Sequence, residues 1–497
     1  MRQLTGLDTQ FLAIESETTV GHVGGLAIFD PSTAPGGRFG ITEIRAMLEE
    51  RLHLLPPLRW TLVTVPLGLD RPYWKDDPDF DLDYHVRELA LPAPGDDDQL
   101  SEQVARIASR RLDRSRPLWE LYVIHGLTAG RVAVLTKMHH AMIDGMSGAE
   151  IMGILFDLAP EGREIPPANG SLPAEEAPGS LEMLGRGVAA LPLYPLRALR
   201  ALPTTLPYLD VAPSIFGLPG AEQVSRGASR LRRRLLGSEE HDGEIVERPK
   251  MRAPRVTFSG KVSPHRRFVF GSMPLADVKR VKNHFGVTVN DVVVSLCAGA
   301  IRDWLIAHDE LPDRPLLAQI PVSVRTSEQM GTYGNRISVM IVPIPTDVAT
   351  ADGRLAASHE SMRAAKDRHK ALPAEALQDV TNFIPPAINA RAARVALQLG
   401  ANSALRPLFN VIISNVPGPP VPLYLAGAKL AANYPVSVIT DGAGLNITVL
   451  SYLDHIDIGV ICDREQMPDV QRILDGMSAE LRALLTLCET ETAGVLP

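Results

Sequence analysis

The chain contains the stretch Lys137-Met138-His139-His140-Ala141-Met142-Ile143-Asp144-Gly145-Met146-Ser147-Gly148. It follows a run rich in β-branched and apolar residues, 131–138, which predicts a buried strand, and it precedes residues 149–158, which predict a helix. The stretch is therefore expected on a strand-to-helix turn. Because successive residues on extended backbone point to opposite faces, at most one of His139 and His140 can face a given channel while the other packs.

A histidine at this turn is a candidate general base. An imidazole titrates near neutral pH, so it can take a proton from an alcohol and return it to a leaving group. Asp144 could orient the ring or fix the turn through another partner, and Gly145 lets the backbone reverse without a Cβ clash. A packed core residue is the commoner role of a lone histidine. The pattern His-His-x-x-x-Asp-Gly, however, arises by chance with a probability on the order of 10⁻³ and favours catalysis.

A metal site is the other sharp interpretation of two adjacent histidines. Four ligands would be needed for a zinc ion, and the sequence offers no second cluster of His, Cys, Asp or Glu to complete the set. We therefore expect no metal.

Composition limits the function classes. At 497 residues the chain is expected to form two domains, and 45% hydrophobic residues suffice for a large core and a channel. A net charge of -8 argues against general nucleic-acid binding, which needs a basic face. Cys297, Cys462 and Cys488 form no disulfide framework, and no signal peptide or spanning segment is evident. We expect a cytoplasmic protein whose membrane contact, if any, is peripheral.

The first part of the chain alternates strands and helices. Thr42 is expected to cap a helix whose buried stripe includes Ile44 and Leu48, and residues 99–112 predict a second helix. Residues 116–124 and 131–138 are expected to pair as a hairpin, because residues 126–130 have turn chemistry. Further strands are expected at 22–29, 58–65 and 84–89.

The middle of the chain, residues 161–260, is rich in proline and arginine. Residues 181–202 carry an apolar stripe with arginines, and residues 226–234 hold five arginines among leucines. Two interpretations remain open. The segment is either a domain-crossing linker with a solvated helix or an interfacial helix that faces anionic lipid.

The last part alternates again. Residues 288–306 predict a helix that is hydrophobic nearly all round and therefore buried between layers. Residues 416–420 contain three prolines and cannot join a ladder. The fold class is thus α/β, with two sandwich domains, 1–160 and 261–497, joined by residues 161–260. Other expected helices are 275–284, 355–370 and 467–485, and the expected strands are 266–270, 316–324, 335–344, 408–415, 430–438, 445–452 and 456–461.

Several short motifs accompany the histidine pair along the chain. They are Leu7-Asp8-x-x-Phe11-Leu12, Pro117-Leu118-Trp119, Asn290-Asp291, Pro321-Val322-Ser323-Val324-Arg325, Gly334-Asn335-Arg336-Ile337-Ser338 and Ser414-Asn415-Val416-Pro417-Gly418-Pro419. The histidine motif alone resembles the signature of the CoA-dependent acyltransferase superfamily, which includes chloramphenicol acetyltransferase and peptide-synthetase condensation domains. The full set resembles the bacterial wax ester synthase/acyl-CoA:diacylglycerol acyltransferase family over nearly the whole chain.

The resemblance implies two chloramphenicol-acetyltransferase-like domains with a tunnel at their interface, joined by a long crossover linker. Acyl-CoA would enter from one side and the alcohol from the other. His140 would be the proton acceptor, supported by His139, Asp144 and Gly145. Other motif residues would line the tunnel or brace the motif, or fill ordinary core positions: Pro117, Leu118, Trp119, Asn290, Asp291, Asn335 and Arg336.

The function that the resemblance implies is O-acyl transfer from acyl-CoA to diacylglycerol, to a long-chain alcohol, or to both. Acyl-CoA is then a co-substrate, and no further cofactor is expected. The inner membrane face or lipid droplets are candidate surfaces for peripheral contact. Two alternatives remain: an acyltransferase with another acceptor, and a non-catalytic lipid-binding relative. A serine hydrolase is disfavoured because the sequence has no G-x-S-x-G elbow.

Overall fold

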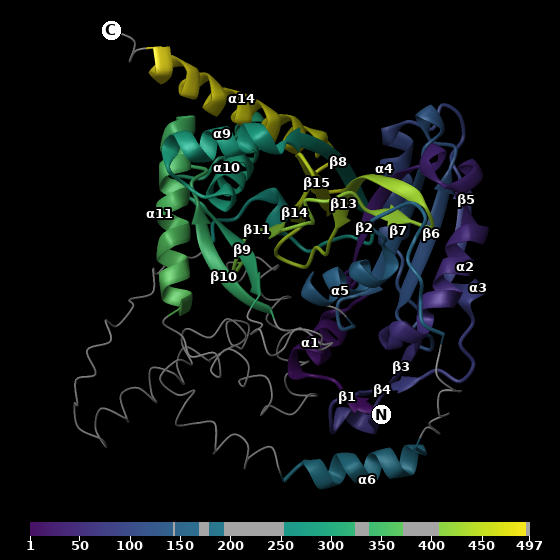
Figure 1. Cartoon of the computed structure of the whole chain (residues 1–497). Helices are drawn as coiled ribbons and strands as arrows, with labels where there is room; N and C mark the ends of the chain where they lie inside the picture. The colour runs from purple at the N-terminus through teal and green to yellow at the C-terminus, as the bar shows by residue number, and fades with distance from the viewer. Residues whose placement is uncertain (143–144, 168–177, 193–252, 324–336, 371–406, 494–497) are drawn as a thin grey trace.

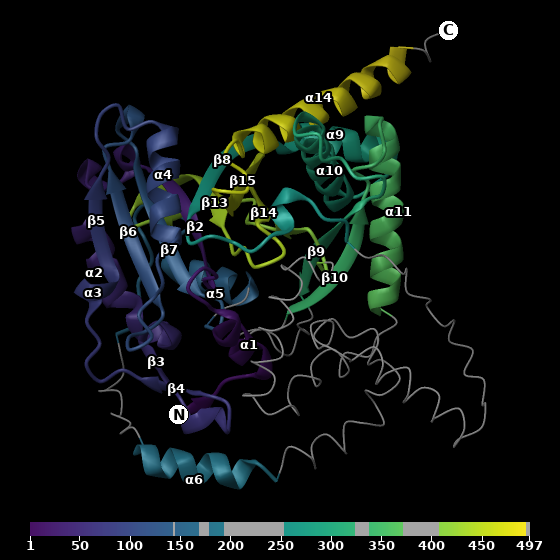
Figure 2. The ribbon, with the colours of Figure 1, turned by 180° about the vertical axis from the view of Figure 1, so that it is seen from behind.

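The computed structural model describes residues 1–142, 145–167, 178–192, 253–323, 337–370 and 407–493. Two six-stranded sheets lie side by side, each covered by helices, and a three-stranded sheet lies near the N-terminus (Figures 1 and 2). The predicted α/β class is therefore confirmed.

The first sheet has the strand order β12-β13-β2-β7-β6-β5. The expected hairpin is present, because β6 (Trp119–His125) and β7 (Val132–His139) pair antiparallel. Its turn needs positive φ values at Gly126 (79°) and Gly130 (66°), which glycine adopts at no steric cost. The remaining strands are β2 (His22–Asp30), β5 (Val86–Ala90), β12 (Tyr424–Leu425) and β13 (Ala428–Val436).

Helices cover both faces of this sheet. On one face α2 (Ile41–Arg51) buries Ile44 and Leu48 against Phe29 and Val123. On the other face α4 (Asp97–Ala108) forms a separate core with residues of both halves of the chain, including Leu26, Tyr122, Phe268 and Val436. The two halves therefore share part of one hydrophobic core.

One segment departs from the sequence prediction. Residues 430–438 were expected in a strand of the second domain, but β13 pairs antiparallel with β2, from Asp30–Lys429 to Gly24–Val436. The proline-rich residues 417–420 end β11 (Val411–Val416) and carry the chain from the second sheet to the first. Buried and less buried side chains alternate along β13 in a way that fits either sheet. The crossing of the chain therefore decides which strand it pairs with.

The second sheet has the order β10-β9-β11-β14-β15-β8. Its strands are β8 (Arg266–Pro274), β9 (Leu316–Ser323), β10 (Ile337–Ile344), β14 (Leu445–Tyr452) and β15 (His455–Asp463). Its helices are α9 (Leu275–Phe285), α10 (Val289–Ala307), α11 (Ala351–Lys370) and α14 (Gln471–Ala493). As predicted, α10 is buried nearly all round, and it packs against α11 and α14.

Three local predictions near the N-terminus need correction. Gly40, and not Thr42, is the N-cap of α2. Residues 84–89 begin as the short helix α3 (Leu82–His85), because Asp81 caps it by accepting from the backbone of Asp83, and β5 starts only at Val86. The strand expected at 58–65 is shortened to β3 (Trp60–Val63), since prolines at 56, 57 and 66 favour 3-10 turns on both sides. With β1 (Arg2–Gln3) and β4 (Tyr73–Asp76), β3 forms the small sheet.

Most of the predicted linker lies outside the described residues, including the arginines at 226–234. Its described part contains α6 (Ser180–Ala190), which lies away from both large sheets at the bottom of Figures 1 and 2. The boundaries 1–160, 161–260 and 261–497 stay a prediction. Within the described ranges no single helix is long and apolar enough to span a membrane; α9 and α10 reach that length and composition only together, and they are bent by 103°.

Candidate active site

The histidine motif lies at the end of a central strand. His139 is the last residue of β7, and its N–H donates to Leu118 O at 2.9 Å. The N–H of His140 donates to Gly21 O at 2.8 Å, and a turn closes where Met142 N–H donates to His139 O at 2.9 Å. Helix α5 (Gly145–Leu155) starts just beyond this turn. The predicted strand-to-helix position is confirmed.

His139 is buried, with 1% of its surface exposed. Its Nδ1 accepts the N–H of Ala141 at 3.0 Å, so a neutral ring carries its proton on Nε2. Nε2 lies 3.2 Å from Glu15 Oε1, at ion-pair distance and without an aligned hydrogen bond. Both ring nitrogens of His139 therefore face protein groups.

Glu15 is a site residue that the sequence analysis missed. Its Oε1 accepts from Gly21 N–H at 2.8 Å, and its Oε2 is 2.5 Å from Arg114 Nη2. Burial alone would raise the pKa of the Glu15 carboxyl, but His139, Gly21 and Arg114 together hold it well below its ordinary value. No local signal in the sequence connects Glu15 to a histidine so far along the chain.

Gly21 allows this close packing. A Cβ at this position would lie 2.9 Å from His139 Nε2 and 3.3 Å from Glu15 Cγ, closer than side chains tolerate. Glycine therefore lets the backbone that holds Glu15 and His140 approach the buried histidine.

His140 has different surroundings. Its ring is partly exposed and stacks on Phe11 with centroids 3.9 Å apart and an interplanar angle of 7°. Phe11 belongs to α1 (Gly6–Ile14), which begins with a capping box between Thr5 and Asp8. The Leu7-Asp8-x-x-Phe11-Leu12 motif thus fixes a helix whose Phe11 orients the His140 ring. The expectation that one histidine packs while its neighbour faces outward fits this geometry.

The residues Pro117, Leu118 and Trp119 are buried beside the motif. Trp119 Nε1 donates to Leu58 O at 2.7 Å, and the ring stacks on His85 with centroids 4.5 Å apart. Because Leu118 O holds the His139 N–H, this motif braces the histidines from the neighbouring strand. These contacts fit bracing and also an ordinary core position, so the role of the three residues stays a prediction.

A buried charge cluster lies behind the histidines on β6 and β7. Lys137 Nζ is 3.3 Å from Glu120 Oε2, which also accepts from Tyr122 O–H at 2.8 Å. Burial lowers the pKa of Lys137, although Glu120 opposes this effect. Burial and the Lys137 charge also lower the pKa of His22, which pairs with His139 across β2 and β7. His22 is therefore neutral near the motif.

Asn290 and Asp291 form the start of α10. Asp291 makes a capping box with Thr288 and accepts from His359 Nδ1 at 2.8 Å, and Asn290 Oδ1 accepts from Asn415 Nδ2 at 3.4 Å. These contacts tie α10 to α11 and β11. Among the described residues, the side-chain hydrogen bonds of this pair do not reach the histidine motif.

Several predicted site residues lie outside the described part of the chain: Asp144, Asn335 and Arg336. Gly145 is described only as the first residue of α5. In the described ranges no group of three His, Cys, Asp or Glu side chains is arranged to hold a metal ion.

Two family models match the chain. The wax ester synthase/diacylglycerol acyltransferase catalytic domain matches residues 4–293, and the WS/DGAT C-terminal domain matches residues 333–485. The first match includes the histidine motif, Glu15 and the Asn290-Asp291 pair.

Proteins of Mycobacterium tuberculosis named diacylglycerol O-acyltransferase are similar over nearly their whole length. One is 36% identical over 488 residues, which is 97% of this chain and 99% of the relative. Another is 33% identical over 496 residues, which is 99% of this chain and 92% of the relative.

Solved structures share the fold. The wax ester synthase/diacylglycerol acyltransferase from Marinobacter aquaeolei VT8 matches with a TM-score of 0.67 and 29% identity, over 98% of this chain and all (100%) of that one. The starter condensation domain of rhizomide synthetase, in complex with C8-CoA, matches with a TM-score of 0.53 and 13% identity, over 98% and 94%. The predicted two-domain architecture is therefore confirmed.

Proposed function

The chain belongs to the wax ester synthase/diacylglycerol acyltransferase family and is an acyltransferase, and on that premise we propose that it transfers a long-chain acyl group from acyl-CoA to the hydroxyl of diacylglycerol, with His140 as proton acceptor. The observation that carries the assignment is the contrast between the two histidines. His139 is buried between Ala141 and Glu15, whereas the His140 ring is partly exposed against Phe11.

The proposed reaction uses the imidazole twice. His140 takes the proton of the acceptor hydroxyl while its oxygen attacks the thioester carbonyl, which forms a tetrahedral oxyanion. The oxyanion then collapses, the C–S bond breaks, and the imidazolium returns the proton to the leaving CoA thiolate. The products are an ester and free CoA. Stacking on Phe11 restricts rotation of the ring and supports a fixed direction of proton transfer.

Two acceptors are compatible with this chemistry. Diacylglycerol is favoured by the names of the mycobacterial relatives, and the Marinobacter protein is described for both wax ester and diacylglycerol acylation. A long-chain alcohol is therefore the second candidate acceptor. Acyl-CoA as donor is supported by the family, and the proposal includes a tunnel between the two sheets in which donor and acceptor meet.

The test is a product analysis with purified full-length protein. Palmitoyl-CoA would be supplied with diacylglycerol, with hexadecanol, or with both, and the lipids formed would be identified by mass spectrometry. We expect triacylglycerol to form and His140→Ala to slow its formation by about 10² to 10⁴-fold, whereas His125→Ala, at the end of β6, keeps the activity of the unaltered protein. If wax ester is the main product, the acceptor is the long-chain alcohol and not diacylglycerol. No ester from either acceptor would refute the function.

We also propose that α6 mediates peripheral contact with a membrane or lipid droplet. Leu181 on α6 is 85% exposed and Val188 is 53% exposed, and Leu67, in the turn Pro66–Gly68 against which α6 packs, is 82% exposed. Gly187 lets α6 pack closely against Val65 and Leu69, so the helix and the turn that carry these exposed apolar side chains are neighbours. Exposed apolar clusters of this kind are typical of interaction sites.

Vesicle sedimentation tests the lipid contact. The double variant Leu67→Ser/Leu181→Ser should pellet less with vesicles than the unaltered chain, whereas Ile306→Ser, an exposed apolar position at the far end of α10, should pellet equally. The arginines at 226–234 would add electrostatic binding to anionic vesicles, about 1 kcal/mol for each basic residue near the surface. This part of the binding should weaken as the salt concentration rises. Equal sedimentation of all three proteins would contradict this proposal.

A further inference from the structure

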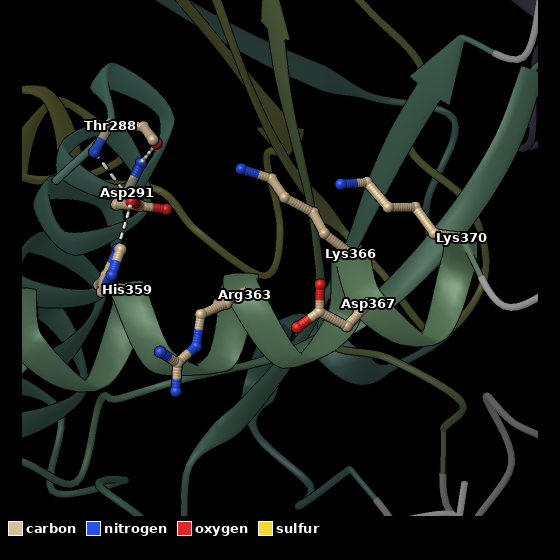
Figure 3. A pocket seen from close by; sticks show the side chains of 7 residues that line it. All are labelled: Thr288, Asp291, His359, Arg363, Lys366, Asp367 and Lys370. Carbon is tan, nitrogen blue, oxygen red and sulfur yellow. Dashed lines mark hydrogen bonds and ion pairs between the residues drawn. The ribbon is translucent and has the colours of Figure 1, made fainter. Parts of the chain in front are cut away.

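A pocket of about 200 Å³ lies between the N-terminus of α10 and the C-terminal half of α11, away from the histidine motif. Figure 3 shows its lining, in which Lys366 and Lys370 extend on the side of α11 that faces Asp291, whereas Arg363 and Asp367 extend on the other side of the helix. The residues that line it are Thr288, Asp291, His359, Arg363, Lys366, Asp367 and Lys370.

The pocket is cationic on an otherwise acidic protein. His359, Arg363, Lys366 and Lys370 follow one another at spacings of four, three and four residues, so they share one face of α11. In the described ranges, no carboxylate forms an ion pair with Arg363, Lys366 or Lys370. This includes Asp367, which is on the same helix and lines the same pocket. Three positive charges therefore line one pocket with two carboxylates, Asp291 and Asp367, and none of the three cations is in an ion pair with a described residue.

The row of cations on α11 is longer than the helix dipole can account for. Cations in the last turn of a helix interact favourably with its dipole, which accounts for Lys370. That effect falls off within one turn, and Lys366 and Arg363 lie further inside α11. These cations also do not simply face solvent. They line a pocket together with Thr288 and Asp291 at the start of α10.

Asp291 supplies a second, independent feature. Its side chain is buried, with 1% exposed, and Oδ2 accepts from Thr288 N–H and from His359 Nδ1. Oδ1 is also buried but has no hydrogen-bond partner. A buried carboxylate oxygen without a donor is costly, so a ligand that offers an N–H or O–H group would be stabilised here. The pocket thus combines cations, which attract phosphate groups, with one hydrogen-bond acceptor, Asp291 Oδ1.

We propose that this pocket binds the phosphorylated nucleotide end of the acyl-CoA donor, an inference that rests on the proposed function. A 3′-phosphorylated adenosine diphosphate carries about four negative charges near neutral pH for Lys366, Lys370 and Arg363, and its ribose and adenine offer donors to Asp291. The volume is smaller than the roughly 300–1,000 Å³ of sites that enclose a whole drug-sized ligand. It therefore fits one end of a long donor, whose acyl thioester reaches elsewhere.

The position of α11 agrees with this assignment. In Figures 1 and 2 the C-terminal end of α11 lies at the level of α5, the helix that follows the histidine motif. Asn290 precedes the pocket residue Asp291, and its Oδ1 accepts a hydrogen bond from Asn415 Nδ2 near the end of β11. The donor would run from α11 past the ends of the second sheet toward His140.

The test uses the full chain and the double variant Lys366→Gln/Lys370→Gln. We expect its KM for palmitoyl-CoA to rise about tenfold or more, which is about 1.4 kcal/mol or more, while kcat at saturating donor stays unchanged. The KM for palmitoyl-pantetheine, a thioester without the nucleotide, should be the same in both proteins. Arg368→Gln, on the same helix but outside the pocket, is the matched control and should leave both KM values unchanged. Thermal denaturation confirms folding, and Lys366→Arg/Lys370→Arg, which keeps the charge, should restore the KM.

Calorimetric titration with adenosine 3′,5′-bisphosphate separates this site from the proposed function, because it needs no turnover. The unaltered protein should bind this probe, and the double variant should bind it at least tenfold more weakly. An equal affinity of both proteins would overturn the site even if acyl transfer occurs. Loss of sedimentation with phosphatidic acid vesicles, at unchanged donor KM, would also overturn it and would assign the cations to a lipid headgroup.

Discussion

His139 and His140 are consecutive residues, yet their side chains meet different surroundings. The His139 ring lies between the Ala141 N–H and the Glu15 carboxylate, and the His140 ring lies against Phe11. The backbone N–H groups of the two histidines donate to different neighbours, Leu118 O and Gly21 O. The pair is thus held from both sides: the His139 ring is fixed in the turn, and the His140 ring is the one that we propose acts on the substrate.

Replacement of each histidine separates these roles. His140→Ala should lower kcat by about 10² to 10⁴-fold, the usual contribution of a positioned general base, with little change in Tm. His139→Ala should lower the free energy of unfolding by about 1–3 kcal/mol, because it removes a buried ring and the partner that Glu15 Oε1 has in addition to Gly21 N–H, and it should reduce turnover less. Kinetics and thermal denaturation of the same preparations measure both effects. An inactive but fully stable His139→Ala protein beside an active His140→Ala protein would reverse the assignment.

Glu15 makes stability depend on pH in a known direction. Its native pKa lies well below the ordinary value of 4.5, so below about pH 5 the unfolded chain binds a proton that the native chain does not. Its stabilising contribution is therefore present above about pH 5 and is lost as the pH falls. Glu15→Gln should have a lower Tm than the unaltered protein at neutral pH, and the difference should shrink in acid. A difference that is constant down to about pH 3 would show that the charge of Glu15 is not involved.

At the scale of elements, the helix that follows the motif is held at its far end by two arginines, the buried Arg51 and the half-exposed Arg163, which also donates to Ile154 O. Arg51 of α2 donates to Ile154 O at 3.0 Å and Leu155 O at 2.8 Å, the last carbonyls of α5. Its Nη2 also lies 2.6 Å from Asp157 Oδ2, with both side chains 4% exposed. This buried contact fixes α5 against α2, and therefore fixes the direction in which α5 leaves the histidine turn.

Arg51→Met should destabilise the protein by about 3 kcal/mol, because the buried Asp157 carboxylate keeps only the longer contact of 3.6 Å with the half-exposed Arg163. The double variant Arg51→Met/Asp157→Leu should recover part of that loss, since it removes both charges. Denaturant unfolding measures the free energies. If the double variant is less stable than Arg51→Met, the burial of Asp157 is not the source of the cost.

At the scale of the whole molecule, the two sheets are linked by an exchange of strands. Residues 417–444 leave the second sheet, add β12 and β13 to the first, and return to β14. Asn433 N–H on β13 also donates to Asp457 Oδ2 on β15 at 2.7 Å, and Arg266 of β8 donates to Thr18 O. Together with the shared core around α4, these contacts make the folding of the two halves interdependent.

A chain that ends at residue 260 should therefore not fold alone. Without β13, β2 becomes an unpaired edge along Gly24 to Asp30, and such edges promote aggregation. Size-exclusion chromatography and circular dichroism should find aggregates or unfolded chain, and co-expression with residues 253–497 should restore a soluble complex. A monodisperse, cooperatively folded fragment would show that the first half does not need the exchanged strand.

The sequence alone determined what depends on local pattern. Hydrophobic periodicity predicted most helices and strands, including the β6–β7 hairpin and the buried helix α10, because side chains repeat every two residues in strands and every 3.6 in helices. The spacing of the histidine motif predicted the strand-to-helix turn, and short motifs predicted the family. Boundaries moved where capping and proline effects competed, as at Gly40 and Val86.

Only the tertiary structure decided which distant segments meet. The pairing of β13 with β2 could not be predicted, because an alternating strand buries its apolar face equally well against either sheet. Glu15 could not be recognised as the partner of His139 and Arg114, and Lys366 and Lys370 could not be placed with Asp291 around one pocket. Each of these groups has a local environment that is unremarkable in sequence. Their charges and hydrogen bonds acquire a role only when the folded chain removes them from water and brings them within a few ångströms of each other.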